Sequence, residues 1–101
     1  MPRARARVRA PARSALEELR LVDGARQALQ SGDARRALDL LEHYETRIAE
    51  PQFELEVGVL RMDALDRLGR AGAAQRQARQ LLTRSLPEPQ AARARAILDR
   101  R

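Results

Sequence analysis

The sequence contains no cysteine, no tryptophan and no lysine, and it has one phenylalanine, one tyrosine and one histidine. Without cysteine, disulfide bonds and thiolate metal sites are excluded. Few aromatic residues argue against a β-sheet, because strands favour aromatic and β-branched side chains. No apolar run approaches the roughly 18 residues of a membrane span, and no signal-peptide core follows the basic N-terminus. We expect a soluble protein, cytoplasmic unless it is a fragment of an envelope protein, which would be periplasmic.

Leucine and alanine supply most of the apolar residues that are present. Apolar residues make up 44% of the 101 residues, which is enough for the core of one small domain. Because both residues are strong helix formers, this core is typical of closely packed helices. The composition predicts an all-α fold.

Positive charge is concentrated at the N-terminus. Residues 1–13 contain no acidic residue and five arginines, which leaves +1 of the net +6 for residues 14–101. Like charges repel and this segment has little to bury, so we predict a disordered or loosely ordered basic arm followed by a helical domain at 14–101. We favour a solubilising leader or a piece of linker for this arm; the alternative is that it binds an anionic partner, either a phosphate backbone or acidic lipid headgroups. Its candidate residues are Arg3, Arg5, Arg7, Arg9 and Arg13.

Helix start and stop signals divide the domain into five segments. Ser14 and Glu17 form a capping box, and Gly32 and Gly69 are suited to the left-handed residue that ends a helix. Pro51 stands where proline is tolerated in a first helical turn. The predicted helices are 14–31, 33–49, 51–69, 72–86 and 89–100.

Apolar spacing gives each helix an expected inner face. In the first helix the stripe of three- and four-residue steps is Leu16, Leu19, Val22, Ala25 and Leu29.

Two further features concern the third helix. Gly58 lies in its middle, where glycine costs about 1 kcal/mol relative to alanine, so we expect a neighbouring helix to approach closely there. Asp63 and Asp66 each precede an arginine by four residues, the spacing of ion pairs with Arg67 and Arg70 on a helix surface.

Two helix–turn–helix units follow one another, with Gly32 and Gly69 at corresponding positions 37 residues apart. Periods in the mid-thirties are typical of helical repeats. The chain resembles the tetratricopeptide repeat of the degenerate bacterial type. In the first unit the matching pattern is Ala25-x-x-Ala28-Leu29-x-x-Gly32-Asp33-x-x-x-Ala37-Leu38-x-x-Leu41. In the second it is Ala64-Leu65-x-x-Leu68-Gly69-Arg70-x-x-x-Ala74-x-x-x-Ala78-x-x-Leu81-Leu82, followed by Pro87.

The resemblance implies antiparallel hairpins whose first helices line a concave, partner-binding surface. On that surface it places Arg26, Gln30, Asp63, Asp66 and Arg67, a mixture of signs that suits a protein partner. Five helices make only two and a half units, whereas about three bury a continuous core. A partner protein, a second copy of the chain or the rest of a longer protein would cover the open face.

Nothing in the sequence indicates an enzyme. His43 has no neighbouring metal ligands at the required spacing, and no glycine-rich phosphate loop follows a strand. We predict a non-enzymatic protein-interaction or scaffold module with no cofactor and no metal. The alternative is weak, salt-dependent binding of nucleic acid without sequence preference through the arm, since the domain offers no exposed aromatic platform.

Overall fold

The computed structural model describes the backbone of residues 2–100 and the side chains of residues 15–100. Five helices follow in order: α1 (Pro2–Gln30), α2 (Ala34–Arg47), α3 (Glu54–Arg67), α4 (Ala71–Leu82) and α5 (Gln90–Asp99). No strand occurs between residues 2 and 100. The predicted all-α class with five helices is confirmed. The side chains of the predicted arm and of Ser14 lie outside the described set, so the roles proposed for them stay predictions.

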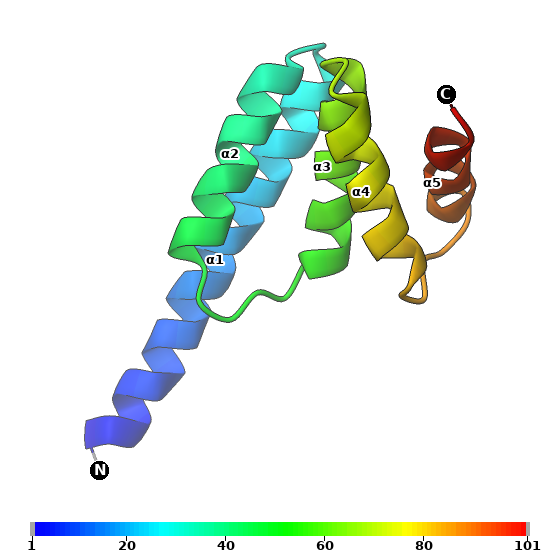
Figure 1. Cartoon of the computed structure of the whole chain (residues 1–101). Coiled ribbons are helices and arrows are strands. Elements are labelled where there is room, and N and C mark those ends of the chain that lie inside the picture. Colours follow the sequence, from blue (N-terminus) through cyan, green and yellow to red (C-terminus); the bar gives the residue numbers. More distant parts are fainter. Residues whose placement is uncertain (1, 101) are drawn as a thin grey trace.

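Consecutive helices run antiparallel, as Figure 1 shows. The α1–α2 and α3–α4 turns lie at one end of the molecule, and the longer α2–α3 and α4–α5 linkers lie at the other. Helix α3 packs against each of the other four helices, including α1 and α5. Helix α3 therefore borders both α1 and α5.

The two turns have the same backbone hydrogen bonds, shifted by 37 residues. Gly32 and Gly69 have φ angles of 85° and 75°, in the left-handed region. The next amide, that of Asp33 or Arg70, donates to a carbonyl five residues back at 2.7 and 3.0 Å respectively. Each glycine amide donates three residues back at 3.1 Å. These paired bonds are the Schellman motif that satisfies the last carbonyls of a helix. The repeat seen in the sequence is thus also present in backbone geometry.

Small side chains let the helices approach closely. Six alanines are completely buried in the core. A Cβ atom added to Gly58 would lie 2.7 Å from Cδ2 of Leu81 on α4. This confirms the expected close approach at Gly58. The fully buried alanines are Ala25, Ala37, Ala64, Ala74, Ala78 and Ala94.

The inner face predicted for the first helix is wrong at its beginning. Leu16 and Leu19 are 51% and 45% exposed, whereas Glu18 is 1% exposed. The buried stripe consists of Glu18, Val22 and Ala25, at spacings of four and three residues. The same helical spacing thus places a glutamate, not a leucine, at the beginning of the inner face.

Among the five described helices, none combines the length and the apolar character that a membrane span requires.

Candidate partner-binding groove

A groove of about 580 Å³ opens where α1, α3 and α5 meet, and both linkers contribute to it. We call it the α1–α3–α5 groove. It is lined by Arg26, Leu29 and Gln30 of α1, Gln52 and Phe53 of the α2–α3 linker, Leu55, Glu56, Val59, Leu60, Asp63 and Arg67 of α3, Leu86 and Pro87 of the α4–α5 linker, and Gln90 and Arg93 of α5.

The floor of this groove is apolar. Leu29, Val59 and Leu60 are between 5% and 8% exposed, so the core of the domain continues into the groove. Phe53 and Leu55 are half-buried at its side. Phe53 both packs against the core and borders this opening, because the linker places it just before α3 begins. An apolar side chain that packs against this floor would remove part of its surface from water.

Two ion pairs in the groove walls join α3 to α1 and to α5. Arg26 pairs with Glu56 of α3 as well as with Asp23 of its own helix. Arg93 of α5 pairs with Asp63 of α3 at 3.3 Å. Burial raises the pKa of Asp63, and the nearby Arg93 and Arg67 oppose that rise. Both carboxylates of the groove therefore already have an arginine partner.

Arg67 is different from the other groove arginines. Its Nη1 donates to the carbonyl oxygen of Leu29 at 2.6 Å, a bond from α3 to the last turn of α1. Among the described side chains no carboxylate lies within 4.0 Å of its guanidinium. Its side chain is exposed. The groove thus holds three cations and two anions, and Arg67 carries the charge that is not matched.

Gln90 adds an unused hydrogen-bond acceptor. Its Oε1 atom is buried and has no donor among the described residues. A buried acceptor without a donor is unfavourable by about 1–3 kcal/mol. An N–H group of a bound molecule would satisfy it.

Four of the five residues predicted from the repeat line this groove: Arg26, Gln30, Asp63 and Arg67. The fifth, Asp66, is not part of the lining and pairs with Arg100 beyond α5. The four come together because helices α1 and α3 are equivalent elements of adjacent hairpins.

The ion pairs predicted along α3 are wrong. Asp63 and Asp66 pair with Arg93 and Arg100 instead of with Arg67 and Arg70. Packing of α5 against α3 supplies these arginines, and the helical spacing alone contains no information about a neighbouring helix.

Sequence reasoning missed Glu18. Its Oε2 accepts hydrogen bonds from the Tyr44 hydroxyl and from the amides of Gln52 and Phe53, at 2.6, 2.6 and 2.9 Å. Burial and the bond to Glu18 raise the pKa of Tyr44, which stays a neutral donor. The available signal was the spacing, since Glu18 lies four residues before the buried Val22.

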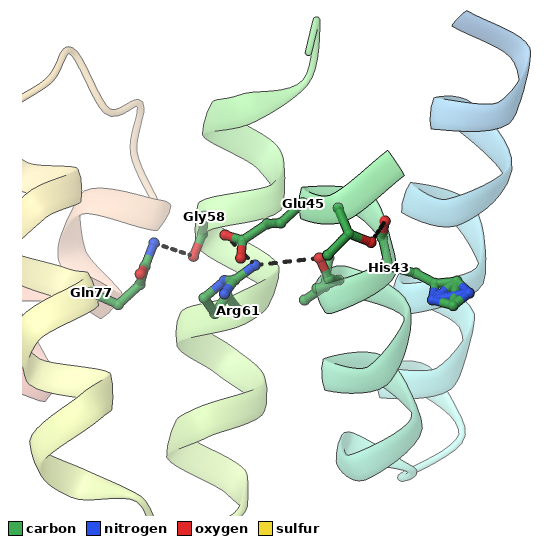
Figure 2. Close-up of polar contacts among 7 residues, drawn as sticks. His43, Glu45, Gly58, Arg61 and Gln77 are labelled. Atoms are coloured by element: carbon green, nitrogen blue, oxygen red, sulfur yellow. Dashed lines mark hydrogen bonds and ion pairs between the residues drawn. The ribbon is translucent and has the colours of Figure 1, made fainter. Parts of the chain in front are cut away.

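The opposite face of α3 holds a more polar hollow of about 490 Å³. There Arg61 contacts Glu45 at 2.8 Å and the Leu41 carbonyl at 3.4 Å, as Figure 2 shows. On its other side Gln77 of α4 donates to the Gly58 carbonyl at 3.4 Å. His43 points away from this cluster and is exposed. These contacts join α2, α3 and α4.

Comparisons with models of protein families, with curated proteins and with solved structures give no match to this chain.

Proposed function

We propose that this chain is a non-enzymatic protein-interaction module and that its α1–α3–α5 groove binds a segment of a partner protein. The observation that carries the proposal is the apolar floor of the groove beside the unmatched charge of Arg67. The resemblance of the two hairpins to tetratricopeptide repeats supports it, because such repeats bind partners on the face of their first helices.

The groove chemistry indicates the kind of segment. The floor of Leu29, Val59 and Leu60 suits an apolar side chain. Arg67 suits a carboxylate next to that side chain, since arginine forms strong charge-assisted bonds with carboxylates. The Gln90 acceptor suits a backbone amide, which an extended segment has available. We therefore propose that the bound segment is extended and has an apolar residue next to an acidic one.

A nucleic acid fits this groove less well. Glu56 and Asp63 lie in its walls and would repel phosphates. Tyr44 is buried, and Phe53 is half-buried at the side of the groove, so neither is an open stacking platform. Polyanion binding through the arm remains a separate prediction about residues 1–13.

Selection from a displayed library of random peptides tests the proposal. We expect enrichment of peptides with an acidic residue next to a leucine-sized apolar residue. Arg67→Glu should lose most of this binding, because it reverses the unmatched charge. Arg79→Glu is the matched control: Arg79 is exposed on α4 outside the groove, so the same charge change should leave binding unaltered.

Three results would contradict the proposal: no enrichment, enrichment of basic peptides, or equal loss in the two variants. Light scattering of the wild-type chain distinguishes a second copy from a different partner. A dimer that disappears in Arg67→Glu but not in Arg79→Glu would mean that the partner segment belongs to the chain itself.

A further inference from the structure

Glu18 is the only charged residue that is buried among residues 15–100. An ionised carboxylate is strongly disfavoured in a protein interior unless its oxygens accept hydrogen bonds. Here one oxygen, Oε2, accepts from Tyr44, Gln52 and Phe53. The three donors come from the end of α2 and from the linker that leads into α3. The side chain of Glu18 on α1 thus fixes the backbone of the linker between α2 and α3.

The linker donors lie at the start of α3. Phe53 is the N-cap residue of α3, and it has no side-chain acceptor for the helix's first amides. The carboxylate of Glu18 lies beside this positive end of the helix, where a negative charge is favourable. Glu18 therefore fixes both the linker backbone and the position at which α3 begins.

The same two residues form the wall of the α1–α3–α5 groove, because Gln52 and Phe53 both line it. We propose that Glu18 is the positioning residue of the groove: it holds the Gln52–Phe53 backbone so that the Phe53 ring borders the apolar floor. The importance of this role for partner binding rests on the proposed function, but the first test of the role needs no partner.

Two substitutions separate this role from simple burial. Glu18→Met keeps the volume and helix propensity of the side chain and removes the acceptor. Glu18→Gln keeps a carbonyl oxygen that can occupy the place of Oε2, and all three donors converge on that one atom. Arg61→Ala is the control, since it removes contacts between α3 and α2 without touching the linker amides (Figure 2).

Amide hydrogen exchange followed by NMR gives the first readout. In Glu18→Met we expect the Gln52 and Phe53 amides to exchange about tenfold faster or more, because each loses its acceptor. In Glu18→Gln the rates should stay within about threefold of the wild type, since a neutral acceptor is only somewhat weaker. Arg61→Ala should leave them unchanged. Wild-type rates in Glu18→Met would overturn the proposal.

Groove binding gives the second readout, with 8-anilinonaphthalene-1-sulfonate as the probe because it joins an apolar body to an anion. Binding is followed from the methyl signals of Val59 and Leu60. Glu18→Met should bind the probe about tenfold more weakly and Glu18→Gln nearly as well as the wild type. Equal affinity in all three chains would overturn the positioning role.

Failure of the two proposals can be told apart. A probe that does not shift Val59 and Leu60 in the wild type contradicts the groove as a binding site, whatever the exchange rates show. If Glu18→Met does not fold, Glu18→Gln still decides. Slow exchange of both linker amides in that variant supports the proposal, and exchange as fast as that of exposed linker amides overturns it.

Discussion

Replacement of Gly58 by alanine should destabilise the fold, although alanine is the better helix former. The new Cβ would lie 2.7 Å from Leu81 Cδ2 and 3.1 Å from Gln77 Nε2, both on α4. Overpacking of this kind costs about 1–3 kcal/mol, and the gain in helix propensity returns about 1 kcal/mol. Leu81 is 4% exposed and has little room to move. The overpacking cost should therefore lie in the upper half of that range, about 2–3 kcal/mol, which leaves a net loss of about 1–2 kcal/mol in the free energy of unfolding.

Urea unfolding followed by circular dichroism measures this loss, and the midpoint of thermal unfolding should fall by about 4–8 °C per kcal/mol in a chain of this size. Gly72→Ala is the control: its Cβ would meet only Arg76 Nη1, at 3.6 Å, so it should stabilise by about 0.4–1 kcal/mol. Leu81→Ala should cost less in the Gly58→Ala background than in the wild type, because it removes the clash. A Gly58→Ala chain as stable as the wild type, or strictly additive effects in the double variant, would refute the close approach of α3 and α4.

Three other predictions concern charge. Stability should fall as the pH rises above about 10, the ordinary pKa of tyrosine, because the unfolded chain then releases a proton that folded Tyr44 keeps with its raised pKa; Tyr44→Phe should remove this dependence in unfolding measured against pH. Burial also raises the pKa of Asp63, so folded Asp63 takes up a proton at a higher pH than the unfolded chain does. The free energy of unfolding should therefore increase as the pH falls through that raised pKa towards about 4, and Asp63→Asn should abolish this gain. The same pH profile in the variant and the wild type would contradict the burial. If the arm binds polyanions, replacing the five arginines of residues 1–13 by glutamine should abolish salt-dependent retention of a single-stranded oligonucleotide in a filter-binding assay, and unchanged retention would eliminate this alternative.

Local sequence signals were sufficient to predict the number of helices and the two glycine turns, although α1 begins at Pro2 and not at Ser14. Glycine at a helix end has a conformational reason that needs no tertiary context, and so Gly32 and Gly69 marked the turns correctly. The repeat then brought Arg26 and Gln30 of α1 into the same predicted site as Asp63 and Arg67 of α3. Equivalent helices of successive hairpins pack side by side, which is why these four residues line one groove.

Contacts between distant segments could not be predicted in the same way. The spacing places Glu18 on the buried face of α1, but only its partners, 26 to 35 residues further along the chain, explain why a glutamate is stable there. Asp63 and Asp66 had plausible partners in their own helix, yet α5 provided others. In both cases the preference of a side chain depends on which backbone or charge another helix places beside it, and spacing within one helix does not determine that.

The two ends of the molecule differ in how far the repeat is kept. The turns at one end repeat the same backbone hydrogen bonds with a shift of 37 residues, whereas the linkers at the other end differ in sequence, length and contacts. Both linkers nevertheless supply groove residues: Gln52 and Phe53 from the first, Leu86 and Pro87 from the second. The repeated turns thus give the α1–α2 and α3–α4 hairpins the same connection, and the irregular linkers that lead into α3 and α5 give the groove its individual shape. The Glu18 carboxylate binds the backbone of the first of these linkers, so it stabilises a part of the groove that the repeat does not determine.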